Sequence, residues 1–66
     1  MNVKVNGSPM AIPEEVNILG LLGILDIAPA RSVVEVNGVI IDRASFGACL
    51  AREGDRIEIV RFVGGG

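Results

Sequence analysis

The sequence predicts an α+β domain in which a mixed sheet of four or five strands carries one main helix across one face. Three observations lead to this prediction. Short runs in which apolar residues alternate or cluster, typical of strands, occur near both ends of the chain and in its middle. Asn-Gly pairs follow two of these runs, where they favour tight hairpin turns. Between the two predicted hairpins, apolar residues recur at the spacing of a helix face.

The first hairpin is predicted near the amino terminus. Val3 and Val5 alternate with polar residues, which is the pattern of a half-buried strand. The following Asn6–Ser8 reads as a turn, because Asn and Gly tolerate positive φ. We expect the return strand over Met10–Ile12, stopped by Pro13, since proline fits only the end or the edge of a sheet.

The main helix is predicted to begin after Asn17, a plausible N-cap residue. Its apolar face follows the helical spacing i, i+3, i+4, i+7 and consists of Ile18, Leu21, Leu22 and Leu25. Gly20 and Gly23 each weaken such a helix by about 1 kcal/mol relative to alanine. We therefore expect the helix to depend on the sheet for its stability, and Pro29 to mark its end.

The second half of the chain predicts another hairpin and a last strand. Val33–Val36 and Val39–Ile41 flank Asn37-Gly38, a strong short-range hairpin signal. The stretch Asp42–Leu50 is predicted to be irregular or a short helical turn, anchored in the core by Phe46 and Leu50. Glu53–Asp55 predicts a turn, and Arg56–Val63 predicts the last and longest strand. The charge pairs Arg52/Glu53 and Asp55/Arg56 are interpreted as a solvated turn that adds little stability.

Alternation along the last strand divides its side chains between two faces. We assign Ile57 and Ile59 to the core side, under the helix, which leaves Val60 and Phe62 on the open face of the sheet. An exposed aromatic residue beside the carboxyl terminus would serve as a partner-docking patch. The alternative is that a twist or bulge turns Phe62 inward, or that side chains of another strand cover it.

Composition limits the classes of function. Sixty-six residues make one small domain, and we expect a domain over residues 1–63 with a flexible glycine tail over residues 64–66. The chain has no histidine and one cysteine, so neither a metal site nor an internal disulfide is expected. Cys49 is interpreted as a small buried hydrophobic residue.

Charge and hydropathy exclude two further classes of function. The net charge is −2, and the basic residues form no stripe that would bind nucleic acid. No apolar run is long enough to span a membrane. A lone thiol without a signal peptide predicts a cytoplasmic location.

The sequence ends in Gly64, Gly65 and Gly66, directly after the last predicted strand. Because glycine makes up about 7% of residues, such a triplet at a given place is rare by chance. Glycines offer a thin backbone that can enter a narrow channel, with a carboxylate at its tip. We interpret the carboxylate of Gly66 as the functional group. The alternative is a frayed end without function. A catalytic role for the chain itself is not expected, because no triad or metal cluster is evident.

The terminal segment, residues 53–66, closely resembles the C-terminal block of the thiamine-biosynthesis sulfur-carrier family, ThiS. Val36–Ile40 resembles the central hairpin of that family, and the order of elements is that of the ubiquitin-like β-grasp fold. The resemblance implies that an E1-like enzyme adenylates Gly66 with ATP and Mg²⁺, that the carboxylate becomes a thiocarboxylate, and that thiazole synthase receives the sulfur. We also expect that this chain binds no cofactor of its own and is a monomer when free.

Three other functions stay open at this point. The chain could be the small subunit of molybdopterin synthase, which ends in two glycines on the same fold. It could be a protein modifier joined to lysines through its terminus, or an interaction module whose tail does nothing.

Overall fold

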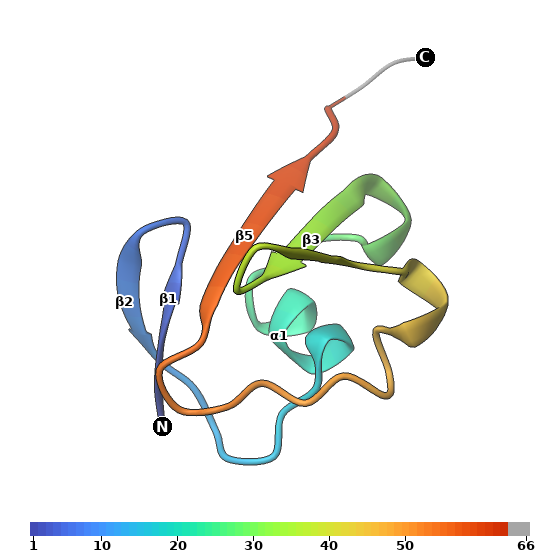
Figure 1. The fold of residues 1–66 in the computed structure, drawn as a ribbon. Coiled ribbons are helices and arrows are strands. Elements are labelled where there is room, and N and C mark those ends of the chain that lie inside the picture. Colours follow the sequence, from blue (N-terminus) through green and yellow to red (C-terminus); the bar gives the residue numbers. More distant parts are fainter. Residues whose placement is uncertain (64–66) are drawn as a thin grey trace.

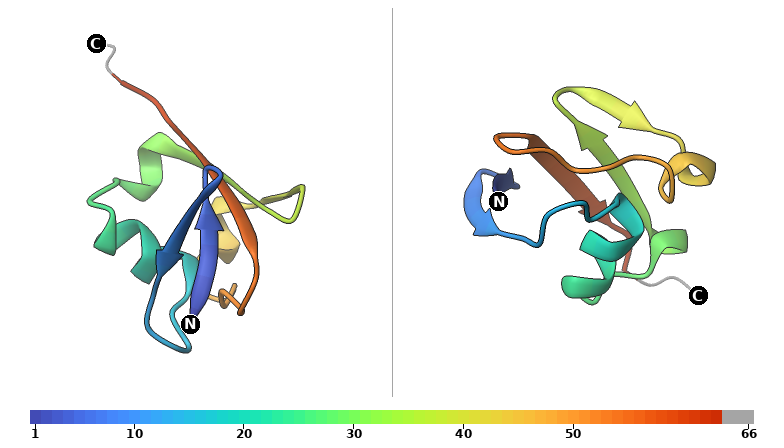
Figure 2. Two further views of the ribbon diagram at one scale, coloured as in Figure 1. Left: turned by 90° about the vertical axis from the view of Figure 1, so that its left-hand side faces the viewer. Right: turned by 90° about the horizontal axis from the view of Figure 1, so that it is seen from below.

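The computed structural model describes residues 1–63. It contains one five-stranded sheet with the strand order β2-β1-β5-β3-β4 and a short helix, α1, on one side of the sheet (Figures 1 and 2). The strands are β1 (Asn2–Val5), β2 (Ser8–Ala11), β3 (Ser32–Val36), β4 (Val39–Ile41) and β5 (Arg56–Arg61). The helix α1 is Ile18–Ile24, and two short 3₁₀ helices are η1 (Pro29–Arg31) and η2 (Arg43–Ser45). The predicted mixed sheet with one helix across one face is confirmed.

Both predicted hairpins form, and each turns on an Asn-Gly pair. Asn6 and Gly7 have φ of 49° and 84°, and Asn37 and Gly38 have φ of 52° and 85°. Positive φ at both central residues is what the two-residue hairpin turn requires, and Asn and Gly adopt it at low cost. Pairing therefore resumes immediately after each turn. The first return strand accordingly begins at Ser8, not at Met10 as the sequence suggested.

The last strand joins the two hairpins into one sheet. β5 lies between β1 and β3, parallel to β1 and antiparallel to β3 (Figure 1). The connection from the first hairpin to the second runs through α1, which covers the inner face of the sheet. The tail-bearing strand thus occupies the centre of the fold, where the packing against α1 holds it.

Asn17 caps α1 as predicted: its Oδ1 accepts a hydrogen bond from the amide of Gly20 at 2.8 Å. The helix ends earlier than the sequence suggested, because Asp26 adopts a left-handed conformation with φ of 58°. The amide of Ile27 then donates to the carbonyl of Leu22 at 2.9 Å, the pattern that closes a helix at a left-handed residue. The prediction that Pro29 marks the helix end is therefore wrong. Pro29 instead opens η1.

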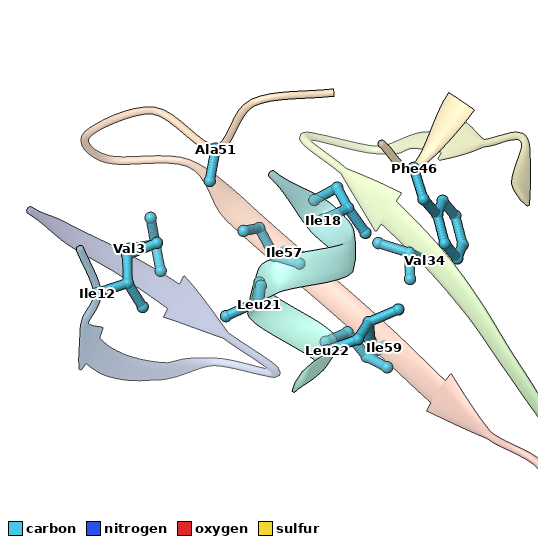
Figure 3. Close-up of a cluster of buried hydrophobic side chains, with 10 residues drawn as sticks. All are labelled: Val3, Ile12, Ile18, Leu21, Leu22, Val34, Phe46, Ala51, Ile57 and Ile59. Carbon is cyan, nitrogen blue, oxygen red and sulfur yellow. The ribbon is translucent and has the colours of Figure 1, made fainter. Parts of the chain in front are cut away.

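The core lies between α1 and the inner face of the sheet (Figure 3). Its members are Val3, Ile12, Ile18, Leu21, Leu22, Val34, Phe46, Ala51, Ile57 and Ile59. Phe46 is the buried anchor that was expected, but the same prediction for Leu50 is wrong, because this side chain is 48% exposed. The amide of Ile18 donates to the carbonyl of Cys49, and the amide of Ala51 donates to the carbonyl of Val16. This strand-like pairing directs Ala51 inward and Leu50 outward.

The turn before β5 is less solvated than predicted. Asp55 is buried, and its carboxylate accepts hydrogen bonds from the amide of Arg52 at 2.8 Å and from the side chain of Asn37 at 3.0 Å. The carboxylate of Glu53 accepts from the amide of Asn2 at 3.0 Å. The interpretation of the Asp55/Arg56 pair as a solvated charge pair is therefore wrong. Asp55 joins the turn to the second hairpin.

Candidate docking face and tail attachment

β5 carries the chain from the core to the glycine tail. Ile57 and Ile59 are buried under α1, whereas Arg61, on the same side of the strand, and Val63, beyond the end of the strand, are exposed. The end of the strand extends past α1 and the β1–β2 hairpin, as Figure 1 shows. The proposed sulfur-carrying and tail residues, Gly64, Gly65 and Gly66, lie outside the residues that the structure describes.

Val60 and Phe62 are exposed by 57% and 50%, respectively. Val60 alternates with the buried Ile57 and Ile59 in β5, so it belongs to the face of the sheet that turns away from α1. Phe62 lies just beyond the end of β5, which stops at Arg61 and not at Val63 as the sequence suggested, and its exposure continues the same alternation. The register inferred from alternation is thus the observed one, and Phe62 is not a core residue. A role for both side chains in docking stays a prediction.

Neighbouring strands extend this exposed apolar area. Val33 lies directly opposite Val60, and Ile40, 67% exposed, is the partner of Glu35 on the next strand. We call Val33, Ile40, Val60 and Phe62 the apolar patch. Sequence reasoning missed Val33 and Ile40 as site candidates. Alternation within the second hairpin could have found them, because Val34 is a core residue and its neighbour must face outward.

Charges on the open face are arranged in order along β5. Lys4 pairs with Arg56 at the end remote from the tail, and Glu35 pairs with Glu58 in the middle. Each of these two pairs joins side chains of like charge, which repel each other. Toward the tail, the open face is first basic, then acidic and finally apolar. A partner surface that carries the opposite charges in the same spatial order would be complementary to it.

Two asparagine side chains hold β5 in place. Beyond the end of β1, Asn6 pairs with Ile59 as a strand residue would: its Oδ1 accepts from the Ile59 amide at 2.7 Å and its Nδ2 donates to the Ile59 carbonyl at 3.1 Å. Asn37 accepts from the amide of Arg56 at 2.9 Å, at the start of the strand. Sequence reasoning treated both asparagines only as turn residues. These contacts fix the strand that carries the tail.

The root of the tail is attached to η1. The amide of Phe62 donates to the carbonyl of Arg31 at 2.8 Å, which adds one hydrogen bond beyond the last residue of β5. Arg43 in turn donates from Nε to the carbonyl of Pro29 at 3.1 Å and so ties η1 to the rest of the domain. A shallow pocket of about 230 Å³ beside Val33 and Ile40 is also lined by Arg43. A partner side chain could enter it next to the apolar patch.

Other candidate chemistry is sparse in the described part of the chain. Cys49 is partly buried against the core, in keeping with the interpretation as a small hydrophobic residue. Among residues 1–63, no group of three or more His, Cys, Asp or Glu side chains could hold a metal ion. No helix within this range is long and apolar enough to cross a membrane.

Comparisons with known proteins agree with the sequence resemblance. The sequence pattern of the ThiS family matches residues 3–66. The crystal structure of the thiamine biosynthesis protein ThiS from Geobacter metallireducens superimposes with a TM-score of 0.84 at 39% identity, and the match covers 100% of both chains. This match confirms the β-grasp architecture.

Two curated relatives are much longer than this chain. Proteins named thiazole synthase from Magnetococcus marinus and Paramagnetospirillum magneticum are 38% and 32% identical to it over 66 residues. The matched region is the whole of this chain but 20% of each relative, so the chain spans about a fifth of their length.

Proposed function

The chain belongs to the ThiS family, and we propose that the carboxylate of Gly66 is adenylated by an E1-like enzyme and then converted to a thiocarboxylate that supplies sulfur for thiazole formation. Family membership supports a sulfur-carrier role in thiamine biosynthesis. The observation that carries the proposal is the match of the family pattern through the three consecutive glycines Gly64, Gly65 and Gly66.

The chemistry explains why such a carrier needs a partner enzyme. A free α-carboxyl group has a pKa of about 3.3–3.7, so it is anionic at neutral pH and resists attack by a nucleophile. Adenylation by ATP releases pyrophosphate and gives an acyl-adenylate, in which AMP is a good leaving group. A sulfur nucleophile then forms the new carbon–sulfur bond as AMP departs. The adenylating enzyme supplies Mg²⁺ and positions the reacting groups, so the carrier serves as a protein co-substrate and binds no cofactor of its own.

Glycine suits the reactive end for steric reasons. Without side chains, the tail can enter a narrow channel and leaves the acyl carbon unhindered. Three extended residues span about 10 Å, at about 3.3–3.6 Å per residue. The carboxylate can then reach a buried site in a partner while the folded domain stays outside. We propose that the apolar patch rests against the mouth of that channel, since Phe62 lies two residues before the tail.

The proposed partners are an E1-like adenylating enzyme and thiazole synthase. The two longer relatives named thiazole synthase support the second partner, because each includes a region similar to this chain. They also favour the thiamine pathway over molybdopterin synthesis. We propose that the carrier meets both enzymes in the cytoplasm and is a monomer between these encounters.

Growth experiments test the pathway. Deletion of the gene should prevent growth without thiamine, and addition of either thiazole or thiamine should restore growth. A plasmid copy that lacks the codon for Gly66 should fail to complement, whereas the intact copy should succeed. Growth of the deletion strain without thiamine, or rescue by the copy without Gly66, would contradict the proposal.

A further inference from the structure

The half of β5 that leads to the tail has a neighbour on one side only, among the residues that the structure describes. Toward β3, pairing continues through Ser32 opposite Arg61. Toward β1, pairing is limited to Lys4 with Arg56 and Val5 with Ile57, after which the chain turns away. Figure 1 shows β5 extending past the β1–β2 hairpin. The last position on that side is filled by the side chain of Asn6, which pairs with Ile59.

The hydrogen-bond pattern shows which main-chain groups face the unoccupied side. The carbonyl of Ile57 accepts from the amide of Asn6, and both main-chain groups of Ile59 bond to the Asn6 side chain. The amide of Phe62 points the other way, to the carbonyl of Arg31. Because these directions alternate along a strand, the amide and carbonyl of Arg61 face the same side as those of Ile59. They lie one step beyond Asn6, where no described strand continues the ladder.

We propose that an extended segment of thiazole synthase adds to this edge of β5 and pairs with the main chain of Arg61. Thiazole synthase is chosen over the adenylating enzyme because the two longer relatives of that name each contain a region similar to this chain. The inference rests on the proposed function and specifies how that partner holds the tail. The amide and carbonyl of Arg61 continue the hydrogen-bond ladder between β1 and β5. An extended polypeptide is the complementary ligand, because its own carbonyl and amide groups can pair with them. The edge also leads directly into Val63 and the tail, so an enzyme that encloses the tail must run alongside it. Arg61 and Val63 are both exposed and leave the approach open.

The outer strands of the sheet are less suited to this pairing. β2 contains Pro9, which has no amide hydrogen to donate. β4 has three residues and lies at the edge of the sheet, separated from β5 by β3. A charged residue on an exposed edge disfavours pairing between copies of one protein. Arg61 is such a residue, exposed at the end of β5.

Amide hydrogen exchange tests the pairing at one residue. The amide hydrogens of the isotope-labelled chain would be exchanged for deuterium, once in the free chain and once in a saturated complex with thiazole synthase. After dissociation of the complex, the amide hydrogens that remain would be measured by NMR. We expect the Arg61 amide to exchange rapidly in the free chain and at least tenfold more slowly in the complex. The Val60 amide is the internal control, because it faces β3 and should be slow in both states. Unchanged exchange at Arg61 in a saturated complex would overturn the proposal but leave the sulfur-carrier function standing.

A pair of variants separates strand pairing from simple burial. Arg61→Pro removes the amide hydrogen that faces the free edge, where proline is tolerated in a sheet. Arg61→Ala removes the guanidinium but keeps that hydrogen. We expect Arg61→Pro to bind thiazole synthase at least tenfold more weakly than Arg61→Ala. Equal affinities for the two variants would overturn the strand pairing.

If Arg61→Pro lowers the melting temperature of the free chain, a loss of binding could come from unfolding. The exchange rate of the Arg61 amide in the complex then tests the proposal by itself. Absence of any complex between the unaltered chain and thiazole synthase would overturn this proposal together with the partner assignment.

Discussion

Asn6 and Asn37 each have two functions in this small domain. Their backbones supply the positive φ that the hairpin turns need, and their side chains bond to the strand that bears the tail. The first function is readable from the sequence, because Asn-Gly between apolar runs is a local signal. The second is not, since it depends on which distant strand the fold brings beside each turn.

The Asn37 contacts should make a measurable contribution to the free energy of unfolding. Asn37→Gly keeps the turn conformation and the main-chain bond to Arg56, but it removes the side-chain bonds to the Arg56 amide and to the buried Asp55. Loss of a partner by a buried acceptor costs about 1–3 kcal/mol. For a domain of this size, each 1 kcal/mol lowers the melting temperature by about 4–8 °C. The double variant with Asp55→Ala is the control, and strictly additive effects on unfolding would show that the two side chains do not interact.

Cys49 should be dispensable for sulfur transfer despite being the one thiol of the chain. It is partly buried against the core and belongs to no metal-binding group in the described residues. We expect Cys49→Ser to form the thiocarboxylate at a nearly unchanged rate, with at most some loss of stability. The measurement is mass spectrometry of a folded variant after incubation with the adenylating enzyme. A folded Cys49→Ser protein that gains no sulfur would assign the thiol a direct role.

At the scale of the element, β5 combines three environments in six residues. One face enters the core through Ile57 and Ile59, the other exposes Val60, and the last residues extend past the helix. The division between faces follows from the two-residue period of a strand and could be predicted. The position at which β5 leaves its neighbours could not, because it depends on where the β1 turn and η1 lie in space.

Phe62→Asp should weaken docking without unfolding the domain. Half of the Phe62 side chain is exposed, and the contact that ties this residue to η1 uses its backbone amide. A carboxylate buried in an apolar interface would be desolvated, so we expect at least a tenfold loss of affinity for one or both partner enzymes, which corresponds to about 1.4 kcal/mol. A titration with each partner and a melting curve make the measurement.

The control for Phe62→Asp is Leu50→Asp, which alters a similarly exposed apolar residue outside the apolar patch. The control should bind both enzymes with unaltered affinity. Equal affinities of Phe62→Asp and the unaltered chain for both enzymes would move the docking surface elsewhere. A large fall in the melting temperature of Phe62→Asp would show that the side chain stabilises the fold.

At the scale of the whole molecule, the fold was largely predictable because its signals are local. Turn chemistry, alternation and one helical stripe gave the order of elements and the helix-covered sheet. Errors arose where distant contacts decide local structure: Leu50 is turned outward by pairing with the segment before α1, and Asp55 is buried by Asn37. The open-face partners Val33 and Ile40 likewise became visible only with the strand register.

The architecture separates stability from chemistry. The core and the asparagine contacts hold β5, and β5 presents a chain end that carries no side chain. We propose that partner enzymes bind the domain at the open face and at the free edge of β5, and that the reaction takes place at Gly66.

Intact-mass measurement of the chain after incubation with its adenylating enzyme, ATP and a sulfur source tests this account most directly. We predict a mass increase equal to the exchange of one oxygen for one sulfur, located by fragmentation at Gly66. The variant without Gly66 should show no such increase. An unchanged mass in the presence of active enzyme, or a sulfur located at Cys49, would contradict the central claim.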